Sequence, residues 1–155
     1  MTTIEDVEIL LVEDNPNDVE LTLRALQKQN LANRVFVVKD GAEALEFIFA
    51  TGPFAQRKIE NCPKVVLLDL KLPKINGTEV LRRIKSDART RDIPVVVLTS
   101  SDEERDVREA YDLGANSFLR KPDDFTNLIK VSQQLHDYWM ETNLGPDCSP
   151  HRQEE

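Results

Sequence analysis

The sequence predicts an α/β domain built on a doubly wound, five-stranded parallel sheet. Short, continuously apolar runs alternate along the chain with amphipathic helical patterns, and the runs are rich in valine, leucine and isoleucine. Such strands are typical of parallel sheets that carry helices on both faces. Because right-handed crossovers leave only a few topologies open, we expect the strand order 2-1-3-4-5.

Each expected strand is followed by an expected helix. The strands are expected at 7–12, 34–38, 64–68, 94–98 and 116–120. The helices are expected at 16–30, 41–50, 78–86, from a cap at Ser101 or Asp102 to Gly114, and from Asp123 or Asp124 onward. At the first helix, Asn15 fits an N-cap and Pro16 fits the first helical position.

Apolar spacing predicts which side of each helix faces the sheet. The expected inward residues are Val19, Leu23 and Leu26; Ala44, Leu45 and Ile48; Val80, Leu81 and Ile84; Val107, Ala110 and Tyr111; and Leu128, Val131, Leu135 and Tyr138. Residues 51–63 show no periodicity and predict a long irregular loop. We expect one domain over residues 1–142, then a polar, disordered tail over 143–155 and no output domain.

Composition excludes several classes of function. The chain has 155 residues, the size of one domain, and a formal net charge of −8. This acidity argues against nonspecific nucleic-acid binding and against docking on an anionic membrane. No apolar run approaches the ~18 residues of a membrane helix, and residues 1–6 lack the basic region and apolar core of a signal peptide, so we expect a cytoplasmic protein. Cys62 and Cys148 lack metal-ligand spacing, and His136 falls in a helical pattern far from Glu13, Asp14 and Asp69.

Polar side chains follow four of the expected strands. Glu13 and Asp14 follow the first strand, Asp69 the third, Thr99 the fourth and Lys121 the fifth. The carboxyl ends of parallel strands meet at one edge of a sheet, where α/β folds bind their ligands. Each residue alone has an ordinary explanation, such as a solvated turn, a helix cap or a loop. Their conjunction at successive strand ends is what predicts a site.

Clustered carboxylates repel one another unless a cation joins them, and hard oxygen ligands select Mg²⁺ or Mn²⁺. We expect Asp14 and Asp69 to bind the ion directly and Glu13 to bind it directly or through water. Lys121 and Thr99 suit a phosphoryl group beside the metal. Asp69 is the best candidate for a carboxylate nucleophile that forms an acyl phosphate.

The motifs at these strand ends resemble those of the receiver domain of two-component response regulators. They are Leu11-Val12-Glu13-Asp14-Asn15, Val66-Leu67-Leu68-Asp69-Leu70-Lys71-Leu72-Pro73 with Asn76-Gly77, Val97-Leu98-Thr99-Ser100, and Phe118-Leu119-Arg120-Lys121-Pro122. The resemblance covers about residues 7–138 and implies the flavodoxin-like receiver fold. Segment 14–18, the long loop before the third strand and the expected lack of an output domain are similar to the small regulators paired with cyanobacterial phytochromes.

The resemblance implies a mechanism. A partner sensor histidine kinase, in the narrower resemblance a phytochrome, would pass a phosphoryl group to Asp69. Glu13, Asp14 and the backbone carbonyl of Lys71 would place Mg²⁺ beside it. The family's conserved threonine and lysine positions correspond to Thr99, which would swing toward the phosphate, and Lys121, which would pair with it.

The resemblance also implies a conformational readout. Phe118 occupies the family's switch aromatic position, commonly tyrosine, and lacks the hydroxyl, so any switch here works through ring packing. The face formed by the fourth helix, fifth strand and fifth helix would carry the signal through a shift of a pre-existing equilibrium.

Other functions compete with this one. A pseudo-receiver would keep the fold as a binding module without phosphorylation. A haloacid-dehalogenase-type phosphatase would turn substrate over, but it needs a second aspartate two residues after the nucleophile, where this chain has Lys71. A flavodoxin-like cofactor carrier is excluded because Glu13 and Asp14 would repel a phosphate in the first loop.

We expect a homodimer. Tyr138 and Trp139 are adjacent and cannot both occupy the centre of one helix face, so one of them covers a partner surface. The alternative is that Trp139 folds over the edge of its own core.

Overall fold

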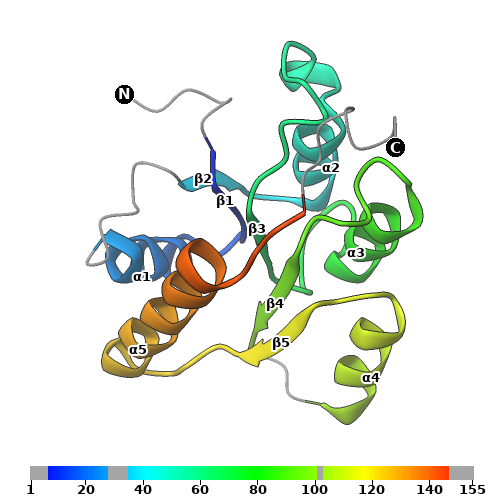
Figure 1. Ribbon diagram of the computed structural model, residues 1–155. Helices are drawn as coiled ribbons and strands as arrows, with labels where there is room; N and C mark the ends of the chain where they lie inside the picture. The colour runs from blue at the N-terminus through cyan, green and yellow to red at the C-terminus, as the bar shows by residue number, and fades with distance from the viewer. Residues whose placement is uncertain (1–6, 28–34, 101–102, 147–155) are drawn as a thin grey trace.

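A computed structural model describes residues 7–27, 35–100 and 103–146 and contains a five-stranded parallel sheet (Figure 1). The strands are β1 (Ile9–Val12), β2 (Val35–Val38), β3 (Val65–Leu68), β4 (Val95–Thr99) and β5 (Ser117–Arg120). The helices are α1 (Pro16–Gln27), α2 (Gly41–Phe49), η3 (Gly52–Phe54), α3 (Gly77–Ser86), α4 (Glu104–Asp112), α5 (Phe125–His136) and η4 (Asp137–Thr142). The order β2-β1-β3-β4-β5 confirms the predicted doubly wound topology.

Helices cover both faces of the sheet. In Figure 1, α1 and α5 lie together on one side, whereas α2, α3 and α4 lie on the other. Alternate strand residues serve the two layers because successive side chains of a strand point to opposite faces. In β1, Leu10 and Val12 join the core cluster under α2 and α3, while Ile9 and Leu11 join the cluster under α1 and α5.

The faces of α2 and α3 agree with the predicted apolar spacing, but two other helices correct it. In α1 the buried residues are Thr22, Ala25 and Leu26, while Val19 and Leu23 are only half-buried. Thr22 and Ala25 are small, which suits a helix that packs against α5 as well as against the sheet. The prediction that Tyr111 faces the core is wrong, because its side chain is 50% exposed. Helix α4 lies at the edge of the sheet and buries only Ala110.

The last helix also departs from its predicted spacing. Leu128 and Leu135 are buried as expected, but Tyr138 is 50% exposed. The chain changes from an α-helix to the π-helical turn η4 at Asp137, and the wider turn shifts the periodicity. Trp139 therefore packs against the core cluster under α1 and α5, which is the alternative in which it covers its own core.

Side-chain caps begin four of the helices, and the one at α1 confirms the predicted cap Asn15. Asn15, Asp40, Asn76 and Asp124 each accept a hydrogen bond from the backbone N–H three residues later. At α4 the residue before the helix is Glu103, which makes no such bond. The predicted caps Ser101 and Asp102, and the predicted stop of the first helix at Asn30, lie outside the described residues.

Buried side chains anchor the long loop at 51–63. Phe54 is buried and meets the rings of Phe36 and Phe47 edge-on, at centroid distances of 5.8 and 5.2 Å. Arg57 is also buried: its guanidinium lies 4.1 Å from the Phe47 ring centroid and donates hydrogen bonds to the carbonyls of Phe47 and Asn61. This loop is therefore part of the core, although its sequence has no regular period.

No helix among the described residues is long and apolar enough to cross a membrane. Residues 143–146 follow η4, and Asn143 N donates to the Tyr138 carbonyl at 2.6 Å. The rest of the predicted disordered tail, from 147 onward, lies outside the described residues.

Candidate functional site

Backbone hydrogen bonds tie the strand-end residues together at the carboxyl edge of the sheet. Glu13 N donates to Val38 O and Asp69 N to Val12 O, both at 3.1 Å. Lys121 N donates to Thr99 O at 2.6 Å. The four predicted strand ends therefore converge in one place.

Three carboxylates form the centre of this place. Glu13, Asp14 and Asp69 each offer an oxygen, and these oxygens lie within 4.8 Å of one another. Glu13 and Asp69 are only 3% and 9% exposed, whereas Asp14 faces solvent. Oxygen-only donors open to water on one side fit Mg²⁺ or Mn²⁺, because these ions keep several water ligands.

The ammonium of Lys121 lies among carboxylates. Its Nζ is 2.5 Å from Glu13 Oε1, 2.9 Å from Asp18 Oδ2 and 3.3 Å from Asp69 Oδ2. The predicted site did not include Asp18, which stands in the first turn of α1. One sequence signal could have found Asp18. It lies in the first turn of the helix that directly follows the Glu13-Asp14 pair.

Burial acts on both charged partners in this cluster. It lowers the pKa of Lys121, but hydrogen bonds to Glu13 and Asp18 and the charge of Asp69 outweigh it, so that pKa lies above its usual value. Burial and the negative charge of Asp69 raise the pKa of Glu13, more than its hydrogen bonds with Lys121 and Asn15 lower it. Glu13 therefore depends on Lys121, or on a cation, to carry its charge.

Both carboxylate oxygens of Asp69 have partners. Oδ1 accepts hydrogen bonds from Thr99 Oγ1 at 2.8 Å and from Lys71 N at 3.2 Å, while Oδ2 faces Lys121. Thr99 is completely buried, and the side chain of Lys71 is exposed. These contacts fix the orientation of the Asp69 carboxylate relative to a hydroxyl and an ammonium.

Close approach of α3 supports the Asp69 backbone. Gly77 N donates to Leu70 O at 2.8 Å. A Cβ added at Gly77 would lie 2.2 Å from Asp69 O and 2.6 Å from Leu70 Cα. Only glycine fits here, so the Asn76-Gly77 pair presses the start of α3 against the residue that the sequence places at the centre of the site.

The aromatic residue Phe118 stands three residues before Lys121 and packs against the core. It stands opposite Val97 in the β4–β5 register, is half-buried and packs against the core cluster under α2 and α3. Its ring therefore contacts apolar neighbours, as expected for a residue without a hydroxyl.

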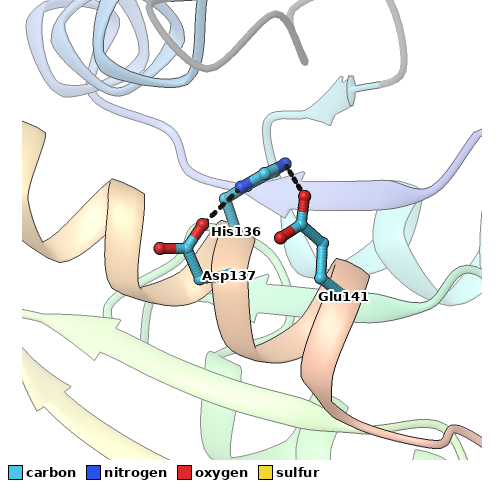
Figure 2. Close-up of side chains that lie close together, drawn as sticks. All are labelled: His136, Asp137 and Glu141. Atoms are coloured by element: carbon cyan, nitrogen blue, oxygen red, sulfur yellow. Dashed lines mark hydrogen bonds and ion pairs between the residues drawn. The ribbon is translucent and has the colours of Figure 1, made fainter.

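A second group of possible metal ligands occurs where α5 meets η4 (Figure 2). Asp137 Oδ1 lies 2.9 Å from Nδ1 of His136, and Glu141 Oε1 lies 3.9 Å from Nε2. The two carboxylates face different nitrogens of the same imidazole ring. Helix α5 begins after the carboxyl end of β5 and runs back along the sheet (Figure 1), and His136 is its last residue, so this group lies away from the carboxyl edge that holds Asp69.

The family is shown by comparison with known proteins. Residues 9–133 match the family model described as the response regulator receiver domain. The chain belongs to the response regulator receiver family. It is therefore a signalling domain of two-component systems and not a conventional enzyme.

Two relatives of this receiver domain are informative. It is 40% identical over 138 residues to the probable methanogenesis regulatory protein FilR2 of Methanothrix harundinacea, covering 89% of this chain and 86% of FilR2. It is 38% identical over 140 residues to response regulator Rcp1 of Synechocystis sp., covering 89% of this chain and 92% of Rcp1.

Solved structures agree with the fold. The phosphorylated cyanobacterial phytochrome response regulator RcpA superimposes with a TM-score of 0.82 at 38% identity, covering 89% of this chain and 96% of RcpA. The Mn²⁺-bound form of Rcp1 gives a TM-score of 0.81 at 37% identity, covering 89% and 97% of the two chains.

Proposed function

We propose that this receiver domain accepts a phosphoryl group on Asp69 from a partner histidine kinase. The observation that carries the proposal is the fixed Asp69 carboxylate, with Thr99 and Lys71 N on one oxygen and Lys121 beside the other. The phosphorylated form of the relative RcpA supports it. RcpA is a phytochrome response regulator, which makes a phytochrome-type kinase the favoured partner.

In the transfer, an Asp69 oxygen attacks the phosphorus of a phosphohistidine on the kinase. The new O–P bond forms as the N–P bond breaks, and the departing imidazole nitrogen keeps the electron pair. Lys121 would pair with the negative oxygens of the transferred group. The hydroxyl of Thr99 would donate to one of them, leaving the Asp69 oxygen that it now contacts.

The carboxylates would hold the metal ion that this reaction needs. Asp14 and Asp69 would bind Mg²⁺ or Mn²⁺ directly, Glu13 directly or through water, and the backbone carbonyl of Lys71 would add a ligand. The bound ion supplies positive charge beside the transferred phosphoryl group. The Mn²⁺-bound form of the relative Rcp1 supports a divalent metal in this family.

The signal would leave through packing around Phe118. Movement of Thr99 toward the phosphate would free space next to β5, and the Phe118 ring would respond by repacking against the core. The face formed by α4, β5 and α5 would then present a different surface to a target. The change would be a shift between two existing states.

We also propose that the domain forms a homodimer that uses Tyr138. Trp139 packs on its own core, which leaves the ring of Tyr138 half-exposed and edge-on to Trp139 at a centroid distance of 4.9 Å. Sedimentation equilibrium of wild type and Tyr138→Ser tests this: a dimer weakened by the substitution supports it, and a monomeric wild type refutes it.

Phosphorylation with a small phosphodonor and Mg²⁺ tests the function. Wild type should gain one phosphoryl group by intact mass, and Asp69→Asn should gain none. Asp112→Asn, an exposed aspartate at the end of α4, is the matched control and should label as wild type does. An unlabelled wild type would favour the pseudo-receiver, and a labelled Asp69→Asn would place the phosphoryl group elsewhere.

A further inference from the structure

Asp18 makes a contact that the phosphoacceptor mechanism leaves unexplained. Its carboxylate Oδ2 lies 2.9 Å from Lys121 Nζ, closer than the carboxylate of Asp69. The side chain of Lys121 is 10% exposed and that of Asp18 is 33% exposed, so the lysine end of the contact is shielded from water. A shielded charged hydrogen bond restrains a lysine far more than a surface pair does.

The start of α1 fixes Asp18 in place. Asn15 Oδ1 accepts hydrogen bonds from Asn17 N at 2.9 Å and from Asp18 N at 3.2 Å. Asn15 N in turn donates to Glu13 Oε2 at 3.1 Å, while the other oxygen of Glu13 contacts Lys121. Glu13, the cap residue and Asp18 thus form one connected unit around the ammonium.

Asp18 lies outside the group that could hold the metal ion. The clustered carboxylates are Glu13, Asp14 and Asp69, and Asp18 is absent from that group. If the proposed metal ion and phosphoryl group bind there, Glu13 and Asp69, two of the three partners of Lys121, would contact them. Asp18 would then be the partner of Lys121 that contacts neither.

We propose that Asp18 is a positioning residue that holds the Lys121 ammonium beside Asp69 through phosphorylation. The expected effect of Asp18 on the phosphorylation rate rests on the proposed phosphoacceptor function. Its expected effect on the mobility of Lys121 rests on the contact alone. Asp18 restricts the long lysine side chain to conformations that reach the phosphoryl oxygens. It thereby lowers the conformational freedom that Lys121 would otherwise lose in the transition state.

Two variants separate position from charge. Asp18→Asn keeps an oxygen that accepts a hydrogen bond from Lys121, whereas Asp18→Ala removes the acceptor. Both lose the same negative charge. Glu20→Ala is the matched control, because Glu20 stands on the same helix and pairs with Arg24 on the exposed side, at 2.6 Å.

The first readout needs no phosphorylation. Acylation of Lys121 by acetic anhydride, followed by peptide mass mapping, reports how readily its amine leaves the carboxylates, loses its proton and meets the reagent. Asp18→Ala should raise the labelling rate of Lys121 about fivefold, as expected for loss of a charge-assisted hydrogen bond. Asp18→Asn should label more slowly than Asp18→Ala because it keeps an acceptor, and Glu20→Ala should stay near wild type.

The second readout is the rate constant for phosphorylation at saturating acetyl phosphate with Mg²⁺. Asp18→Ala should lower it about tenfold, as expected for a misplaced catalytic group, with little change in the half-saturating phosphodonor concentration. Asp18→Asn should recover most of the rate. A residue that only stabilises the fold would change the unfolding midpoint and leave this rate constant unchanged.

The outcomes distinguish this inference from the proposed function. Wild-type labelling and rates in Asp18→Ala would overturn the positioning role and leave the phosphoacceptor function intact. An Asp18→Asn variant as slow as Asp18→Ala would also overturn it, because charge alone would then explain the loss. A wild type that accepts no phosphoryl group would overturn the proposed function and the rate effect, while the Lys121 labelling would still decide whether Asp18 holds the ammonium.

Discussion

Substituting Asp14 should stabilise the domain without metal and abolish its response to metal. The Asp14 carboxylate lies within 4.8 Å of those of Glu13 and Asp69, and it is exposed. At the dielectric constant of water, each such pair repels by about 0.9 kcal/mol. Asp14→Asn keeps the side-chain shape and removes both repulsions, so the free energy of unfolding should rise by about 1–2 kcal/mol.

The expected shift is measurable by thermal melting. For a domain of this size, about 1–2 kcal/mol raises the melting temperature by about 2–8 °C in EDTA. Mg²⁺ should reverse the order. At a concentration of about 100 Kd it stabilises the wild type by about 2.7 kcal/mol, or about 5–11 °C, because it binds only the folded state. Asp14→Asn, which lacks one ligand, should gain little.

The assay is differential scanning calorimetry of both proteins in EDTA and in millimolar Mg²⁺. Asp112→Asn removes another exposed aspartate, at the end of α4, and should follow the wild type in both buffers. A wild-type melt that ignores Mg²⁺ would contradict Asp14 and Asp69 as metal ligands. Loss of stability by Asp14→Asn in EDTA would contradict the repulsion argument.

Three further changes test other parts of the site and fold. Lys71→Ala should speed hydrolysis of the acyl phosphate roughly threefold, because the exposed lysine side chain shields the acyl phosphate from attacking water. The decay of the phosphorylated form, followed by intact mass, measures this rate, and an unchanged rate would refute the prediction. Gly77→Ala should lower the free energy of unfolding in urea by about 1–3 kcal/mol and should also slow phosphorylation, since the added Cβ would lie 2.2 Å from Asp69 O. A variant as stable and as fast as wild type would show that the backbone adjusts without strain. Burial lowers the pKa of Lys85 to about 8, and the charge of Asp92 only partly opposes it. Because this folded-state pKa lies below the unfolded value of 10.5, the stability of wild type relative to Lys85→Met should be lowest below pH 8 and rise from there to 10.5; parallel pH profiles in chemical denaturation would refute it.

The sequence predicted the sheet well because its strands are buried on both faces. β1 and β3 are apolar and fully buried along their length, so their positions and their parallel pairing follow from composition. The strand-end residues then meet because a parallel sheet has one carboxyl edge. The sequence alone therefore predicts that Glu13, Asp14, Asp69, Thr99 and Lys121 lie together.

Contacts that depend on how a helix is turned could not be predicted in this way. Asp18 reaches Lys121 because the Asn15 cap sets the rotation of α1, and no periodicity encodes that angle. Tyr138 leaves the core because η4 changes the helical period after His136, which a fixed spacing of 3.6 residues misses.

The loop at 51–63 illustrates a different limit. Its sequence has no regular repeat, yet Phe54 and Arg57 are buried and tie it to α2. Burial in an irregular segment depends on tertiary contacts with Phe36 and Phe47, which lie earlier in the chain. Pattern-based reasoning therefore located the loop but not its role in the core.

Chemical mapping of the phosphoryl group tests the central claim most directly. Borohydride reduces an aspartyl phosphate to homoserine, so the wild type should be phosphorylated with Mg²⁺, reduced, digested and sequenced by mass spectrometry. We expect homoserine at position 69 and at no other carboxylate. Homoserine at position 14 or 18 instead, 2-amino-5-hydroxypentanoic acid from a phosphorylated Glu13, or neither product at any position would contradict Asp69 as the phosphoacceptor.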